Sequence, residues 1–267
     1  MSNNEFAKMS DSELSQKLGR YQRAARLWTT IGLIGVVSAF VCAFAVSDPV
    51  LKSVLIAALF FGGVCCALFL GGGAQKKLKA LMNAQLGDFF AAELENAFGS
   101  EGRSPELCID EGLIKALNIL DNEWEELEQE NFREGAYRGV GFSAANVRLN
   151  HVYERGVPQD GLETCRDMIF KGLVIRAKTR TGAELTPQLS ERISALSGSI
   201  EGQVLAIGLE NGVLSLALRT DYGFASVASS VDLRDLDALR GSYRRSLEQM
   251  CSFLDLLFES TELFEVK

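Results

Sequence analysis

His151 and Lys171 are the side chains of this sequence whose types best suit acid–base chemistry. His151 is the only histidine, and histidine is the commonest general base. A nucleophile to accompany it is not marked, because the chain has no Gly-x-Ser-x-Gly and no catalytic-cysteine signature. His151 also falls on the apolar side of an alternating segment, which favours a packed histidine that donates to a backbone carbonyl. We therefore assign no catalytic residue from the sequence.

An acidic run and six cysteines are the candidate metal ligands. The run contains Glu123, Glu125, Glu126, Glu128 and Glu130. Three of these would share one face of a helix, but oxygen-ligand sites need a loop that wraps the ion, so a solvated helix face is the favoured interpretation. The cysteines form no Cys-x-x-Cys pair, and one histidine is too few for a Cys/His zinc site. No metal site is predicted.

Residues 139–144, Gly-Val-Gly-Phe-Ser-Ala, match the loose dinucleotide pattern Gly-x-Gly-x-x-Ala. That fingerprint needs a strand before it and a helix after it, whereas here an acidic helical pattern precedes it and an alternating segment follows. Glycines in such a position more often mark a bend or a close backbone approach. No cofactor is predicted.

Two apolar stretches near the N-terminus are long enough to cross a bilayer. Residues 27–46 contain no charge, and residues 54–73 contain none either. Twenty residues of helix span the ~30 Å of hydrocarbon in a membrane. Only Ser47-Asp48-Pro49 and a few neighbours separate the stretches, so they form an antiparallel hairpin. A signal-peptidase site at Ala43-Phe44-Ala45 is disfavoured because a second span follows at once.

Basic residues flank this hairpin on one side only. They are Lys17, Arg20, Arg23 and Arg26 before the first span and Lys76, Lys77 and Lys79 after the second. The positive-inside rule therefore places both termini in the cytoplasm of a multi-pass inner-membrane protein. Lys76, Lys77 and Lys79 are predicted to meet lipid headgroups. From Gly87 onward the chain has 31 acidic and 18 basic residues, which argues against a nucleic-acid partner.

Small residues recur every four positions in both spans. They are Gly35, Ala39 and Ala43 in the first and Ala58, Gly62 and Cys66 in the second. Such a seam lets helix backbones approach closely in lipid. Packing of the two helices against each other is favoured over a homo-oligomer interface, because a hairpin needs a seam of its own.

The remaining sequence predicts an α+β domain with a mostly antiparallel sheet and a long C-terminal helix. Helices are predicted over residues 76–98 and 111–130, the latter from the stripe Leu113, Leu117, Leu120, Trp124 and Leu127. Strands are predicted over 146–153, 168–177, 204–209 and 213–218, with a hairpin turn at Asn211-Gly212. Residues 182–202 include a short helix, and Asp232 caps the last helix. The predicted organisation is 1–26 a basic segment, 27–73 the transmembrane hairpin and 74–267 the cytoplasmic domain.

The segment Phe170-Lys171-Gly172-Leu173, together with Tyr137-Arg138-Gly139 and the two-span layout, resembles the bacterial domain-of-unknown-function 3137 family. The resemblance covers nearly the whole chain, apart from the small-residue-rich segment before the last hairpin. It implies no catalytic residue. It implies a structural or interaction role for Tyr137, Gly139, Phe170, Lys171 and Gly172, with Gly172 allowing close packing and Lys171 exposed or paired with an acid. It also implies a partner among LemA-type membrane proteins.

The function that these observations favour is a non-enzymatic interaction or scaffold module at the cytoplasmic face of the bacterial inner membrane. Two alternatives remain open. One is an enzyme acting on a membrane-proximal substrate through His151, Lys171 and nearby acids. The other is a homo-oligomeric membrane assembly built on the glycine-rich spans.

Overall fold

The computed structural model describes residues 9–99, 104–119, 124–157, 161–228, 230–260 and 262–265. The chain forms two compact units. The anchor unit is the described part of Met1–Phe90 with Ser230–Leu239, and the sheet unit is the described part of Ala91–Ser229 with Arg240–Lys267. Helices α3 (Gly72–Phe98) and α6 (Leu236–Ser260) contribute residues to both units.

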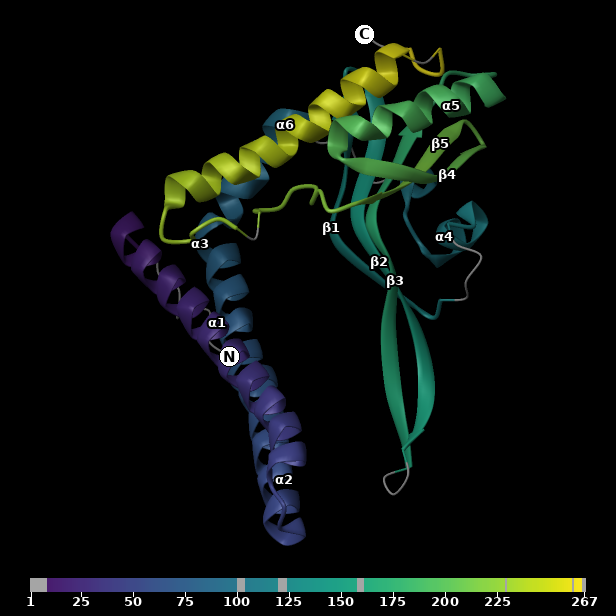
Figure 1. Cartoon of the computed structure of the whole chain (residues 1–267). Helices are drawn as coiled ribbons and strands as arrows, with labels where there is room; N and C mark the ends of the chain where they lie inside the picture. Colours follow the sequence, from purple (N-terminus) through teal and green to yellow (C-terminus); the bar gives the residue numbers. More distant parts are fainter. Residues whose placement is uncertain are drawn as a thin grey trace. The chain divides into compact units, whose positions relative to one another are not determined.

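Two helices joined by a tight turn, α1 (Asp11–Ala45) and α2 (Pro49–Cys65), form the hairpin of the anchor unit (Figure 1). Helix α1 begins at the N-cap Ser10, whose side chain accepts from the Glu13 amide. Helix α2 begins at Asp48, whose side chain accepts from the amides of Val50 and Leu51, with Pro49 in the first turn. These caps satisfy free amides at the helix starts. Close contacts of Gly32 and Gly35 with Gly63 show that α1 and α2 pack as the predicted antiparallel hairpin. A π-helical segment (Cys66–Gly71) joins α2 to α3.

A five-stranded antiparallel sheet forms the framework of the sheet unit. Its strands are β1 (Glu126–Tyr137), β2 (Val140–Val157), β3 (Gly161–Lys178), β4 (Gly202–Glu210) and β5 (Val213–Thr220). Their order is β1-β2-β3-β5-β4, so β3 is central and β1 and β4 are the edges. The predicted turn joins β4 to β5, with Asn211 at φ 53° and Gly212 at φ 72° as a two-residue hairpin turn requires. The α+β fold class is confirmed.

Both faces of the sheet are covered, and Figure 1 shows α4 and α6 on opposite sides of it. A 3₁₀ turn (Pro105–Leu107) and α4 (Glu111–Leu117) pack Ile109 and Ile114 against Val147 and Phe170. Helix α6 buries the apolar stripe predicted for it: Leu233 just before the helix, then Leu236, Leu239, Tyr243, Leu247, Met250, Leu254 and Leu257. Helix α5 (Pro187–Leu196) and a 3₁₀ turn (Ser197–Ile200) occupy the segment where a short helix was predicted.

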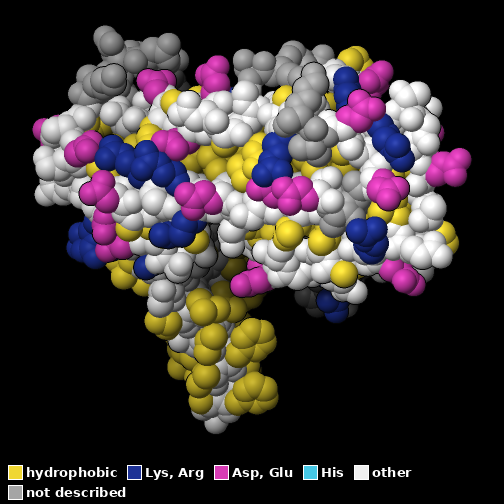
Figure 2. Space-filling view, turned by 90° about the horizontal axis from the view of Figure 1, so that it is seen from above, with side chains coloured by type: hydrophobic (Ala, Val, Ile, Leu, Met, Phe, Trp, Pro, Cys, Tyr) yellow, Lys and Arg dark blue, Asp and Glu magenta, His cyan; other side chains and the backbone are white. Residues whose placement is uncertain are grey.

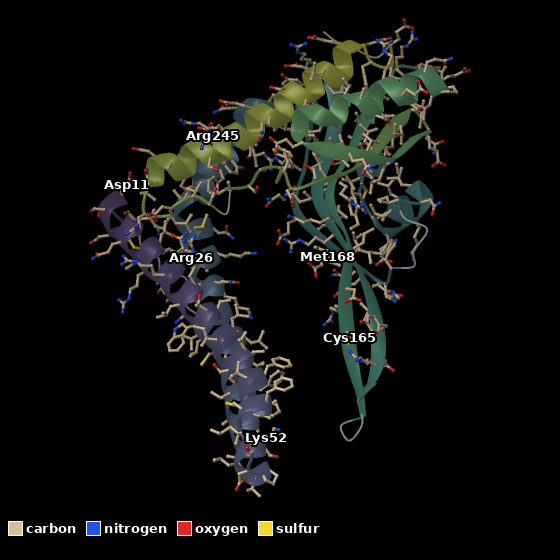
Figure 3. All side chains as sticks on the ribbon, viewed as in Figure 1. Asp11, Arg26, Lys52, Cys165, Met168 and Arg245 are labelled. Atoms are coloured by element: carbon tan, nitrogen blue, oxygen red, sulfur yellow. The ribbon has the colours of Figure 1, made fainter. Side chains whose placement is uncertain are left out.

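Strands β2 and β3 continue past the sheet as a two-stranded ribbon (Figure 1). Strand β1 pairs with β2 only as far as Asn150, and β5 pairs with β3 only from Gly172 onward. Beyond these points β2 and β3 pair only with each other, for example at Tyr153 opposite Cys165. Figure 3 labels Cys165 on this ribbon and Met168 near its base.

The strands predicted over 146–153 and 168–177 are longer, at Val140–Val157 and Gly161–Lys178. Two predicted helix boundaries are wrong. The helix expected over 111–130 ends at Leu117, where Asn118 adopts φ 46°, and β1 starts at Glu126. Pairing with β2 overrides the helical propensity of the glutamates, whereas Leu113, Leu117, Trp124 and Leu127 still pack on one core; Leu120 lies outside the described residues. Helix α6 starts four residues after Asp232, and Asp235 caps it by accepting from the Ala238 amide at 2.9 Å.

Candidate functional site

The outer surface of the hairpin is apolar. Each of the two helical stretches contains an 18-residue window apolar enough to cross a membrane, and only 11% of each window is buried. Exposed large side chains include Leu33, Phe40, Phe44, Val50 and Phe69, and Phe44 is 91% exposed. Figure 2 shows hydrophobic side chains gathered over one part of the visible face, whereas acidic and basic side chains intermingle over the remainder. A core helix of a soluble protein would bury these side chains, whereas here they form a large exposed apolar surface.

The basic residues of the two helices lie at one level along the hairpin. A Cβ added at Gly71 would lie 3.1 Å from Thr29 Oγ1, which places residue 71 beside the first apolar turn of α1. Because the helices are antiparallel with equal rise, Lys76, Lys77 and Lys79 are level with Arg20–Arg23. All of these bases are exposed. Figure 3 shows Arg26 well separated from Lys52, which lies near the turn. We call these seven bases the basic collar: Lys17, Arg20, Arg23, Arg26, Lys76, Lys77 and Lys79.

The seam between α1 and α2 is made of glycines. A Cβ at Gly63 would lie 2.7 Å from the Gly32 carbonyl oxygen, and a Cβ at Gly35 would lie 3.0 Å from Gly63 Cα. Gly35 and Ala39 therefore belong to the seam as predicted, and Ala39 is buried. On α2 the predicted set is wrong by one residue, because Gly63 faces α1 whereas a Cβ at Gly62 would meet nothing within 4 Å.

The segment that leads into α6 docks on the polar face of α1 within the anchor unit. Ser15 Oγ donates to the Arg234 carbonyl at 2.6 Å, and Gln22 both donates to the Val231 carbonyl and accepts from the Leu233 amide. Gly19 makes room for the Arg234 side chain, since a Cβ there would lie 2.2 Å from Arg234 Cγ. The described part of the basic N-terminal segment is thus the docked first half of a long helix.

A shallow polar hollow lies beside this docking contact. Its lining includes Asp11, Ser12, Asp232 and Asp235. Arg234 Nε donates to Asp232 Oδ2 at 2.9 Å, and these hydrogen bonds lower the pKa of Asp232 to about 2. Among the residues that the structure describes, no group of three or more His, Cys, Asp or Glu side chains is arranged to hold a metal ion.

The Phe170-Lys171-Gly172 motif has a structural explanation. A Cβ at Gly172 would lie 1.9 Å from the Leu218 carbonyl oxygen on β5 and 2.8 Å from Phe170 Cζ, so only glycine fits. Phe170 is 1% exposed and covers the glycine from the same face of β3. Lys171 points to the other face, where Nζ lies 2.7 Å from Asp221 Oδ1. The close packing expected of Gly172 and the acidic partner expected of Lys171 are both present.

The two-residue turn Arg138-Gly139 joins β1 to β2, and Tyr137 comes directly before it. Arg138 and Gly139 both have positive φ, at 48° and 79°. Arg138 Nε lies 2.9 Å from Asp255 Oδ1, and a second nitrogen of Arg138 bonds Glu259. The turn is therefore held to α6 by carboxylates one helical turn apart. Sequence reasoning missed Arg138, Asp255 and Glu259, although the spacing of the two acids on a helix was a usable signal.

We expect the sheet unit to lose stability between about pH 10 and pH 12. Burial is the main cause that raises the pKa of Tyr137 and that of Tyr243 from 10.0 to about 12. A phenol whose pKa is higher in the folded chain contributes its full stability below pH 10, and that contribution falls as pH rises towards 12. Urea unfolding of the native chain and of Tyr243→Phe at pH 9 and pH 11 measures this. Between pH 9 and pH 11 the native chain should lose more free energy of unfolding than the variant. Equal losses would contradict a raised pKa of Tyr243 as a source of the loss.

The acidic run lies mainly on β1 rather than on a helix, which corrects the sequence interpretation; Glu123 lies outside the described residues. Its members are neutralised across strands. Glu126 accepts from Arg166 Nε at 3.0 Å, and Arg148 lies 3.9 Å from both Glu128 and Glu130. These exposed pairs explain the cluster without a cation.

His151 is not packed against a backbone carbonyl, so that prediction is wrong. Its Nδ1 lies 3.1 Å from Glu125 Oε2, and its ring stacks on Tyr153 with centroids 5.5 Å apart. The side chain is 39% exposed because it lies where the sheet gives way to the ribbon. Lys171 is opposite Arg148 in the register, three residues from His151 along β2. An odd separation on a strand puts the two side chains on opposite faces, so they do not form one site.

Comparison of the chain with protein-family models, with curated proteins and with solved structures gave no match. The class of protein is therefore defined by its own architecture. It has two helices able to span a membrane, joined in a hairpin, and an antiparallel α+β unit.

Proposed function

We propose that this protein is a non-enzymatic interaction module anchored in the bacterial inner membrane. The observation that carries the proposal is the exposed apolar surface of α1 and α2, which matches lipid and not water. The hairpin crosses the membrane twice, and the basic collar lies at the cytoplasmic headgroups.

The orientation rests on charge. The collar contributes seven bases at one end of the hairpin, whereas the turn at the other end has only Asp48 and Lys52. Trp28, directly after the collar on α1, is at the level where aromatic side chains meet headgroups. Anionic lipids of the cytoplasmic leaflet attract each base by about 1 kcal/mol. The basic collar, which includes Lys76, Lys77 and Lys79, thus favours this orientation and holds the hairpin at the cytoplasmic leaflet.

The role of the acidic sheet unit is to bind another membrane protein. His151 and Lys171 lie on opposite faces of the sheet, so the enzymatic alternative has no shared site for them. Membership of the domain-of-unknown-function 3137 family remains a prediction. A LemA-type membrane protein is the partner that this resemblance predicts. A mild-detergent pull-down of the full chain should recover one partner in constant proportion; repeated recovery of the chain alone would contradict this role.

Labelling of cysteines with a membrane-impermeant maleimide tests insertion and orientation together. Cys108 is exposed in the sheet unit, and Ser47 lies in the turn of the hairpin. In intact spheroplasts the native chain should stay unlabelled until lysis, whereas Ser47→Cys should be labelled at once. Labelling of the native chain before lysis would show that the orientation is the opposite of the proposed one. Release of the chain from floated membranes by urea would refute insertion.

A further inference from the structure

The two edges of the sheet differ in charge and polarity. The β1 edge carries Glu126, Glu128, Glu130 and Glu134, and a bulge interrupts its pairing after Glu130. These features discourage addition of another strand. Strand β4 has no charge from Gly202 to Leu209, and Val204–Leu209 are all half-buried. A bulge at Leu205 leaves Ala206–Glu210 in regular pairing with β5. The outer edge of β4 is therefore a short strand without charged side chains before Glu210.

The hairpin turn determines which groups of β4 face outward. Glu210 and Val213 flank the two-residue turn, so they exchange hydrogen bonds with each other. The pattern alternates along the strand, so Ile207 and Leu209 direct their N–H and C=O groups away from β5. Among the described residues none hydrogen-bonds to this outer edge.

We propose that two copies of the chain associate antiparallel through β4, so that one sheet continues across both. With Gly208 opposite Gly208, Ile207 of each copy exchanges hydrogen bonds with Leu209 of the other. Gly208 suits this position, because the pair that does not exchange bonds brings Cα atoms closest. Glu210 then lies opposite Ala206 of the second copy, so the two acids are kept apart. A second copy of β1 would instead bring like charges together, which is why β4 is the self-complementary edge.

Leu209→Pro tests this interface without removing a bond of the β4–β5 ladder, because the N–H that it deletes points outward. The chain offers a closely matched control at the other edge. Ala136 lies in Gly-Ala-Tyr-Arg-Gly on β1, and Leu209 lies in Gly-Leu-Glu-Asn-Gly on β4. Each residue lies two positions before its turn and follows a glycine. Each also directs its backbone N–H away from the neighbouring strand. Both variants should keep the native circular dichroism spectrum.

The readout is the mass of the detergent-solubilised full chain across a dilution series. We expect a dimer for the native chain and for Ala136→Pro. For Leu209→Pro we expect a dissociation constant about tenfold higher or more, because each dimer loses two donors. A milder variant, Ile207→Lys, should also dissociate the dimer, and it replaces Leu209→Pro if that chain unfolds.

Three outcomes would overturn the proposal. These are a monomeric native chain, a dimer that survives both β4 variants, and a dimer dispersed by Ala136→Pro. A dimer that survives both β4 variants but is dispersed by Gly62→Leu would instead place the contact on the outward face of α2. None of these results bears on membrane insertion, which flotation measures separately.

Discussion

Replacing Gly172 with alanine is expected to unfold the sheet unit or to reduce its free energy of unfolding by at least about 3 kcal/mol. The added Cβ would lie 1.9 Å from the Leu218 carbonyl oxygen, and real Cβ atoms do not approach any atom so closely. The obstacle is backbone of β5, so no side-chain rotation relieves it. The central strand must move away from β5 or tilt, and either change breaks ladder bonds of β3.

Gly198→Ala is the matched control for this experiment. Gly198 is also in the sheet unit, but a Cβ there would meet nothing within 4 Å. Its free energy of unfolding, measured by thermal unfolding followed by circular dichroism, should stay within about 0.5 kcal/mol of that of the native chain. If Gly172→Ala unfolds like the native chain, the close approach of β3 and β5 is wrong.

Gly63→Leu is expected to separate α1 from α2. A Cβ at Gly63 would lie 2.7 Å from the Gly32 carbonyl oxygen and 3.1 Å from the Val36 amide nitrogen, so leucine has no room in the seam. Close backbone packing supplies much of the attraction between helices in lipid, because lipid gives them no hydrophobic drive to associate. The hairpin should therefore splay or re-pack in a different register.

Cross-linking measures this separation directly. Thr29→Cys and Gly71→Cys, in a chain whose native cysteines are serine, place two thiols where Gly71 meets Thr29 across the seam. We expect efficient disulfide formation in this chain, little after Gly63→Leu, and native levels after Gly62→Leu, since Gly62 faces away from α1. Equal cross-linking in all three chains would show that the glycine contact is not what holds the hairpin.

Local signals in the sequence predicted the turn between β4 and β5, the two apolar spans and the apolar stripe of α6. Asn211-Gly212 was recognisable because few residues tolerate two successive positive φ values, and these two have them. The spans were recognisable because their length and lack of charge match a bilayer. These features depend on neighbours within one turn or one helix.

Features that depend on distant partners were predicted less well. The glutamates of residues 125–130 favour helix locally, and only pairing with β2 makes them a strand. Gly62 and Gly63 are adjacent glycines in one apolar helix, and the choice between them depends on how α1 packs. Asp255 and Glu259 gained significance only when the chain brought Arg138 to them.

The ribbon makes stability uneven along single strands. Near Val147 and Gly172 the backbone of β2 and β3 is hydrogen-bonded on both sides, whereas beyond Asn150 and Met168 each strand has a neighbour on one side only. Opening the ribbon breaks few bonds and exposes little apolar core, so its local unfolding costs much less free energy than that of the sheet. The far half of each strand can therefore fray, bend or accept inserted residues while the near half keeps the core intact.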